Sequence, residues 1–245
     1  MSFVIFVQSA MSQITDRMVS LVAGGTGNVG RAIVHGLLMR RATVVVPSRS
    51  ASKLEALGRA EGPDTQNRLI TIVGDVSDEQ DAERIRAEAL ERAGRLDAVV
   101  ASLGSFAAAP SLLAASRATL DRVLADYLLA HFVAARTFIP LFAKTGGCYL
   151  FINGPLAFAP TPGSGLVSIA TAGQAMLVDV LVRETASSLA RVNELVVNVG
   201  VGWGSADETQ RNGERVADAV AKILIDGTAS GRIYLGEDDA IRNRA

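Results

Sequence analysis

Glycine recurs at every third position in the stretch AGGTGNVG, at Gly24, Gly27 and Gly30. An apolar run, MVSLV, precedes this stretch, and a helical pattern, RAIVHGLLMRR, follows it. Glycines between a strand and a helix permit a tight turn and let the backbone approach a pyrophosphate, which the partial positive charge of the helix N-terminus stabilises. We therefore expect a dinucleotide-binding turn formed by Gly24, Gly25, Thr26, Gly27, Asn28, Val29 and Gly30. The alternative is a glycine-rich turn that only packs the helix on the strand.

The end of the second apolar run, ATVVVPSRS, indicates which dinucleotide would bind. A fold that selects NAD usually places a carboxylate here, on the ribose 2′-hydroxyl, whereas this chain has Ser48 and Arg49. A guanidinium can pair with a 2′-phosphate, so we expect NADP(H) in preference to NAD(H). Arg49 could instead be a solvated side chain at the start of a helix. After the third run, Asp75 and Val76 would border the adenine, or Asp75 would cap the next helix.

The elements that must position these residues alternate along the chain. Short β-branched runs are separated by longer helical patterns, which is typical of a parallel sheet covered on both faces. We expect later helices over residues 116–144, 168–191 and 213–225, and later strands at CYLFIN, LVVNVG and RIYLG. The sequence therefore predicts an α/β fold: a Rossmann-like, doubly wound, parallel sheet of about seven strands with helices on both faces. Residues 18–245 would form this single domain, and residues 1–17 an arm or leader.

Composition narrows the possible partners. Basic residues are scattered and the net charge is −1, so nucleic acid is not expected as a partner. No apolar run is expected to span a membrane. Cys148 is the only cysteine, which excludes an internal disulfide and a multi-cysteine metal site and fits the reducing cytoplasm. We expect a buried thiol at Cys148, no metal site, and a cytoplasmic location.

Taken together, these segments resemble the short-chain dehydrogenase/reductase family, from about Met18 to Gly236. The resemblance is carried, in this order, by AGGTGNVG, VVPSRS with KLEAL, GDVSD, GRLDAVVASLG, LDRVLADYLLAHF, LVRETASSL and LVVNVGVG. The segment GRLDAVVASLG matches the family's strand-four Asn-Asn-Ala-Gly stretch and implies that Ser102 and Gly104 lie beside the cofactor. The glycine turn is closer to the Gly-x-x-Gly-x-x-Gly of the extended and atypical branches than to the pattern of the standard branch.

Members of this family reduce carbonyls or oxidise alcohols with a serine, a tyrosine, a lysine and a fifth-helix asparagine. Alignment of CYLFING with the family's fifth strand places Gly154 at the serine position, Val167 at the tyrosine position and Thr171 at the lysine position. The asparagine position falls on Tyr127. Glycine and valine cannot exchange a proton, and a threonine hydroxyl does not titrate near neutrality. The resemblance therefore implies a site in which all four roles are vacant and no catalytic residue is secure.

Three nearby side chains are candidate substitutes. Tyr127 and His131 are one helical turn apart and could form a displaced proton-transfer pair, or they could be packed interface residues. Ser168 could bind a ligand or cap the helix that follows it. Asn153 and Ser164 also border the vacated site, and Trp203 could stack on a ligand or cover the end of the sheet.

Three functions are consistent with this sequence. The first is an NADP(H)-binding protein with a degenerate active site that serves as a sensor, regulator or partner subunit. The second is an NADPH-dependent oxidoreductase of a small carbonyl or alcohol with an unorthodox proton donor. The third is a purely structural subunit. In each case the resemblance implies a homodimer or homotetramer formed through the fifth and sixth helices.

Overall fold

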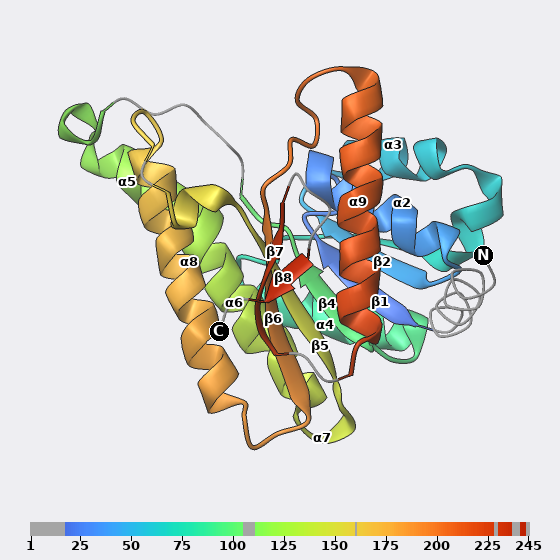
Figure 1. Cartoon of the computed structure of the whole chain (residues 1–245). Coiled ribbons are helices and arrows are strands. Elements are labelled where there is room, and N and C mark those ends of the chain that lie inside the picture. Colours follow the sequence, from blue (N-terminus) through green and yellow to red (C-terminus); the bar gives the residue numbers. More distant parts are fainter. Residues whose placement is uncertain (1–17, 105–110, 160, 228–229, 237–240, 244–245) are drawn as a thin grey trace.

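A sheet whose first seven strands run parallel lies at the centre of the molecule (Figure 1). The computed structural model describes residues 18–104, 111–159, 161–227, 230–236 and 241–243, so the arm or leader expected at residues 1–17 lies outside the described residues. The strands are β1 (Val19–Ala23), β2 (Thr43–Ser48), β3 (Leu69–Val73), β4 (Ala98–Ala101), β5 (Gly147–Asn153), β6 (Ala190–Val197), β7 (Gly231–Leu235) and β8 (Ile241–Asn243). Their spatial order is β3-β2-β1-β4-β5-β6-β7-β8, and β8 pairs antiparallel with β7.

Helices cover both faces of this sheet (Figure 1). One layer contains α2 (Asn28–Met39), α3 (Ala51–Glu61) and α9 (Ala206–Ile225), and the other contains α4 (Glu79–Ala93), α6 (Ala130–Phe138), α7 (Phe142–Thr145) and α8 (Gly165–Glu184). Successive strand residues point to opposite faces. In β5, Cys148 and Leu150 contribute to the first layer's core, whereas Tyr149 and Phe151 contribute to the second. The predicted Rossmann-like fold is confirmed, and the Cys148 thiol is buried as expected.

The long helix expected over residues 116–144 is interrupted in two places. The pieces are α5 (Arg117–Leu124), a π-helical turn η3 (Ala125–Leu129), α6, a 3-10 turn η4 (Ile139–Leu141) and α7. Pro140 lies in η4 and lacks the N–H that would continue the α-helical hydrogen bonds. The π-helical turn contains Tyr127, and such turns are frequent at functional sites. Residues 117–145 are therefore helical as expected, but η3 and η4 depart from α-helical geometry.

The boundary between α8 and β6 also differs from the prediction. The helix expected over residues 168–191 ends at Glu184, and β6 begins at Ala190, within the range assigned to the helix. Strand β6 contains Asn193 and Glu194, whose side chains are both fully buried. The expected strand LVVNVG overlaps the second half of β6, and these polar residues obscured the first half from a search for apolar runs. Ser168 consequently lies inside α8 and is not its N-cap; Ser164 holds that position.

Helix α9 begins earlier than the residue 213 expected from the sequence. Ser205 accepts a hydrogen bond from the Glu208 N–H, and the Glu208 carboxylate accepts one from the Ser205 N–H at 2.9 Å. This capping box starts the helix at Ala206, seven residues before the expected start.

Arginines cover the free edge of the sheet at β3. The Arg84 guanidinium donates to the Val73 carbonyl at 2.7 Å, and Arg92 donates to the Thr71 carbonyl at 2.8 Å. These carbonyls would otherwise lack a strand partner, because β3 is the first strand in the sheet. Charged side chains at an edge strand are a common means of preventing further strand pairing.

Two helical stretches are long and apolar enough to span a membrane by length and composition, which corrects the expectation that none would be. They are Arg117–Thr145 and Gly165–Glu184. Both contribute buried residues to the packing beneath them, including Phe138 and Val178. Because the core helices of a globular protein pass the same test, this finding is weak evidence for a membrane.

A buried charge pair joins β6, β7 and α8. The Glu194 side chain is fully buried and accepts a hydrogen bond from the Arg232 guanidinium. Arg232 also donates to Asp179 and to the Ala175 carbonyl, each at 3.0 Å. Its guanidinium lies 4.8 Å from the centroid of the Phe158 ring. A single arginine therefore ties the sheet to α8 and to the loop after β5.

We expect Arg232→Met to lower the free energy of unfolding by about 3–5 kcal/mol, because the change leaves the Glu194 carboxylate buried without its cation. Urea unfolding of the purified variant measures this loss. Arg117→Met is the matched control: Arg117 pairs with Asp121 on the surface of α5, and its loss should leave the unfolding midpoint nearly unchanged. Equal effects of the two substitutions would contradict the importance of the buried pair.

Candidate functional site

Two adjoining hollows lie at the carboxyl ends of the parallel strands, where ligands of such sheets bind. The first, which we call the β2 hollow, has a volume of about 330 Å³ and lies among the glycine turn and the ends of β2 and β3. The second, the β5 hollow, has a volume of about 310 Å³ and lies beside the end of β5. Ser102, Leu103 and Gly104, after β4, line both. Together the two hollows form one groove across the strand ends.

Most of the predicted cofactor residues line this groove. Those in the β2 hollow are Gly24, Thr26, Gly27, Ser48, Arg49, Asp75, Val76, Ser102 and Gly104. Val29 lines the β5 hollow, and Asn28 lines a different cavity. Gly25 and Gly30 line none of these hollows. A Cβ at Gly30 would lie 2.1 Å from the Gly24 carbonyl oxygen, so Gly30 lets α2 pack against the turn.

The glycine turn presents an uncapped helix end to the β2 hollow. Gly24 has a φ of +78°, and a Cβ there would lie 2.0 Å from the Ser102 carbonyl oxygen, so glycine is required. No side chain caps the N-terminus of α2, whereas Ser50, Asp78 and Ser205 cap α3, α4 and α9. The first N–H groups of a helix lack intrahelical partners. At α2 they remain available to an anion.

Two cations line the β2 hollow. The Arg49 side chain is 74% exposed, and its guanidinium lies 3.7 Å from the Asp75 carboxylate. Lys53 lines the same hollow four residues further on and was not expected from the sequence. The spacing Arg-x-x-x-Lys across the start of a helix was the available signal. Asp75 accepts hydrogen bonds from the Ser77 N–H and hydroxyl, and Asp78, not Asp75, caps α4.

The four residues that the resemblance aligns with the family's reacting side chains meet in the β5 hollow. Gly154, Val167, Thr171 and Tyr127 all line it. Val167 is buried, and the Thr171 hydroxyl donates to the Val167 carbonyl of its own helix at 2.8 Å. The Thr171 hydroxyl is thus already engaged within α8. None of these side chains carries a charge into the hollow.

Tyr127 is the titratable group of this hollow. Its ring packs against Gly104, where a Cβ would lie 2.4 Å from the Tyr127 ring. Burial, and secondarily the Asp126 charge, raises the pKa of Tyr127 to about 12. The phenol therefore stays protonated near neutral pH, which makes it a hydrogen-bond donor and a poor base.

The other two candidate substitutes lie outside the described lining of the hollow. His131 is fully buried, with its ring 5.4 Å from that of Phe151, so it belongs to the core of one subunit and is not exposed for an interface. Burial lowers the pKa of His131 to about 4, against an opposing effect of the Leu103 backbone. The Ser168 hydroxyl is buried and has no hydrogen-bonding partner among the described residues. The structure does not bring Tyr127, His131 and Ser168 together in one cleft.

Asn153 and its neighbours form the polar floor of the β5 hollow. The Asn153 amide donates to Glu194 at 2.7 Å and to the Thr171 carbonyl at 3.1 Å, and its oxygen accepts from the Gly154 N–H. The Gln174 amide donates to the Ile152 carbonyl at 3.0 Å. At the rim, Trp203 lines the hollow with 62% of its surface exposed. Ser164 is buried at the start of α8 and does not line the hollow.

The low pKa of His131 predicts an acid-dependent loss of stability. His131 is neutral in the fold down to about pH 4 but takes up a proton below its ordinary pKa of 6.5 when unfolded. Stability should therefore fall as the pH drops from 6.5 to 4, by roughly 3 kcal/mol over this window. His131→Leu should remove that part of the pH dependence in urea unfolding at pH 7 and pH 4.5.

The control is His35→Leu, because His35 is the only other histidine of the chain and its side chain is 59% exposed. This variant should keep the pH dependence of the unsubstituted protein. A pH dependence that His131→Leu leaves unchanged would contradict the assignment.

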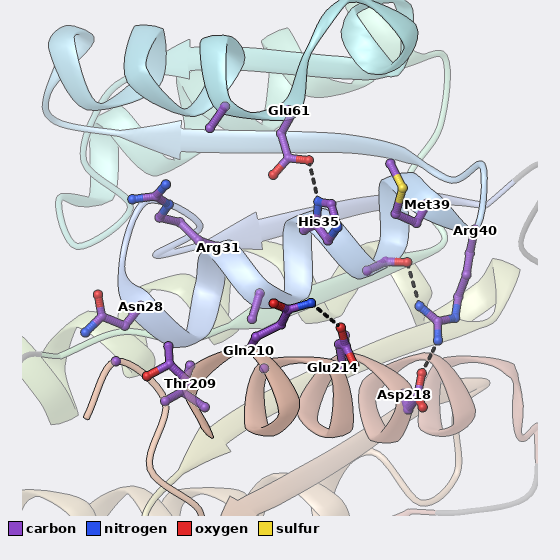
Figure 2. Close-up of a pocket in the computed structure, with 17 residues that line it drawn as sticks. Asn28, Arg31, His35, Met39, Arg40, Glu61, Thr209, Gln210, Glu214 and Asp218 are labelled. Carbon is purple, nitrogen blue, oxygen red and sulfur yellow. Dashed lines mark hydrogen bonds and ion pairs between the residues drawn. The ribbon is translucent and has the colours of Figure 1, made fainter. Parts of the chain in front are cut away.

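A larger cavity, of about 710 Å³, lies between α2, α3 and α9 (Figure 2). Its polar side chains largely bind one another: His35 is 2.9 Å from Glu61, Gln210 donates to Glu214 at 3.1 Å, and Arg40 pairs with Asp218. This cavity lies on a helical face and not at the strand ends. It holds none of the positions that the family uses for chemistry.

Comparisons with known proteins agree with this geometry. A family model described as short chain dehydrogenase matches residues 18–200. The chain is 27% identical over 198 residues to cis-2,3-dihydrobiphenyl-2,3-diol dehydrogenase of Paraburkholderia xenovorans (strain LB400). The matched region covers 78% of this chain and 66% of that protein. The next two curated relatives are covered over 64% and 50% of their lengths. The chain thus spans less than two thirds of these relatives.

Solved structures share the fold at lower identity. A short chain oxidoreductase of Pseudomonas aeruginosa PAO1, solved with NADPH and described as containing an atypical catalytic center, has a TM-score of 0.78 and 20% identity, covering 93% of this chain and 98% of that one. A 3-ketoacyl-(acyl-carrier-protein) reductase of Brucella melitensis, complexed with NADH, has a TM-score of 0.76 and 17% identity, covering 89% and 96%. Both nicotinamide cofactors therefore occur among proteins of this fold.

Proposed function

Since this chain belongs to the short-chain dehydrogenase/reductase family, we propose that it binds NADP(H) and has a degenerate active site, so that it acts as a sensor, regulator or partner subunit. The family binds nicotinamide dinucleotides, and the fold of this chain is the one that binds them. One observation carries the proposal. The glycine turn and the uncapped end of α2 are present, while Val167 and Thr171, which the resemblance aligns with the family's tyrosine and lysine, line the β5 hollow.

The preference for NADP(H) rests on the charges at the end of β2. Arg49 and Lys53 line the β2 hollow, and β2 ends in Ser48 without the carboxylate that would bind a ribose 2′-hydroxyl. A 2′-phosphate next to two cations would be stabilised. Asp75 lies 3.7 Å from Arg49 and would share this guanidinium with the phosphate.

Titration of the purified protein with NADPH and NADH, followed by cofactor fluorescence, tests the binding site. We expect NADPH to bind more tightly, and Arg49→Ala to weaken NADPH about tenfold because a charge-assisted hydrogen bond is lost. NADH binding should change little. Arg59→Ala is the matched control, since Arg59 is an exposed arginine of α3 that pairs with Glu55.

Absence of binding by either nucleotide would overturn the proposal. It would leave the purely structural subunit as the remaining function.

The hydrogen bonds of the polar groups in the β5 hollow support the proposal of a degenerate active site. The Thr171 hydroxyl and the Asn153 amide already bind backbone and buried groups. Tyr127 has a pKa raised to about 12, whereas a proton-transfer group is most effective with a pKa near the working pH. The alternative is an NADPH-dependent oxidoreductase of a small carbonyl or alcohol with an unorthodox donor. A structural neighbour from Pseudomonas aeruginosa is described as an oxidoreductase with an atypical catalytic center, which supports this second function.

We expect NADPH oxidation with panels of carbonyls, imines and enones to stay at the level without protein, because general acid–base catalysis alone contributes about 10²–10⁴ in rate. Absorbance of NADPH measures it. Turnover that Tyr127→Phe or Ser168→Ala abolishes would instead establish the oxidoreductase.

The apolar surface of α6 and α8 supports a homodimer or homotetramer. Phe132, Ile169, Met176 and Val180 expose 44–61% of their surfaces. Exposed apolar patches frequently mark protein interfaces. We expect Met176→Asp to dissociate the oligomer in sedimentation velocity, with Met39→Asp on α2 as the control. A monomer before substitution would contradict this proposal.

A cytoplasmic location also remains a proposal. It is supported by a lone, buried cysteine that suits a reducing compartment.

A further inference from the structure

The described lining of the β5 hollow contains no charged side chain. Its walls are mainly apolar and come from Ile152, Leu156, Val167, Val197 and Val201. The cations Arg49 and Lys53 lie in the β2 hollow instead. A ligand carboxylate or phosphate in the β5 hollow would lose hydration without gaining a side-chain cation, which strongly disfavours its binding.

The polar groups of the hollow leave few hydrogen bonds for a ligand. Asn153, Thr171 and Gln174 donate to groups of the protein. The hydroxyls of Tyr127 and Ser102 have no hydrogen-bonding partner among the described residues. Tyr127 lines only the β5 hollow, whereas Ser102 is shared with the β2 hollow. The Tyr127 phenol, protonated near neutral pH, is therefore the donor best placed for an acceptor oxygen of a ligand.

The rim of the hollow offers a flat aromatic surface. Trp203 is 62% exposed although its indole is a large apolar group. It follows Gly202 in the short loop before α9. Aromatic rings gain from stacking on such a surface beyond the area that they bury. A ring-bearing ligand would cover Trp203.

We propose that the β5 hollow binds an uncharged, ring-bearing ligand that packs on Leu156 and Trp203 and accepts a hydrogen bond from Tyr127. The inference rests on the proposed function, because it takes this hollow to be the ligand half of the dinucleotide groove. It goes beyond the proposed function by naming the chemical class of the ligand that this hollow binds. The lining disfavours anionic ligands, and strongly polar ones find few free hydrogen-bond donors.

Acetophenone and benzoate test the inference, since both carry a phenyl ring and an acceptor oxygen and only benzoate is charged. Saturation-transfer difference NMR of the protein with NADPH detects weak binding and gives dissociation constants. Trp203 is the only tryptophan of the chain, so quenching of tryptophan emission reports binding at this rim. We expect acetophenone to bind at least about tenfold more tightly than benzoate.

Two substitutions locate the binding. Leu156→Asp places a carboxylate in the hollow and should weaken acetophenone at least about tenfold. Leu189→Asp is the matched control, because Leu189 is 61% exposed and lies outside the described lining. Tyr127→Phe should weaken acetophenone about two- to tenfold through loss of one hydrogen bond. Circular dichroism confirms that each variant is folded.

The outcomes separate this inference from the proposed function. Equal or tighter binding of benzoate, binding of neither probe, or acetophenone binding that Leu156→Asp leaves intact would overturn the inference. If NADPH binds in these experiments, the proposed cofactor site survives that failure. If acetophenone binds as expected but NADPH does not, the proposed function fails and the chemistry of the hollow stands.

Discussion

The parallel direction of β1 to β7 is the constraint on which the rest of the structure depends. Parallel strands need a connection that crosses back over the sheet, so helices cover both faces and the inner strands are buried on both sides. The same constraint gathers all seven carboxyl ends along one edge. The glycine turn after β1, Arg49 after β2, Asp75 after β3 and Gly154 after β5 therefore meet there although they are far apart in the sequence.

The features predicted from the sequence are those that local patterns specify. The glycine turn and the alternation of strands and helices follow from local patterns along the chain. Gly154, Val167 and Thr171 were singled out by the resemblance to the family, and the structure places all three around one hollow. The predicted element boundaries were wrong where a residue distant in the sequence determines whether a polar side chain can be buried. Glu194 is polar in the sequence, but Arg232 neutralises it from β7, and a fully buried strand results.

The candidate side chains show the same limit at the site. A spacing of four residues suggested that Tyr127 and His131 share a helical face, but this spacing lies across the π-helical turn. Tyr127 lines the β5 hollow, whereas His131 is buried beside Phe151. Lys53 was not expected because the spacing Arg-x-x-x-Lys, although present in the sequence, does not by itself show that both side chains line one hollow. The places of His131 and Lys53 depend on the packing around them and not on residue type alone.

The arginines at β3 have a consequence for how copies of this chain can associate. A chain that sought to lengthen the sheet at this edge would first have to displace Arg84 and Arg92 from the carbonyls of Val73 and Thr71. Both guanidiniums are about half exposed and also pair with Asp81 or Glu88, so they resist strand addition through the charge and bulk that they place at this edge. Strand-by-strand growth into ribbons or fibrils is thus opposed at β3.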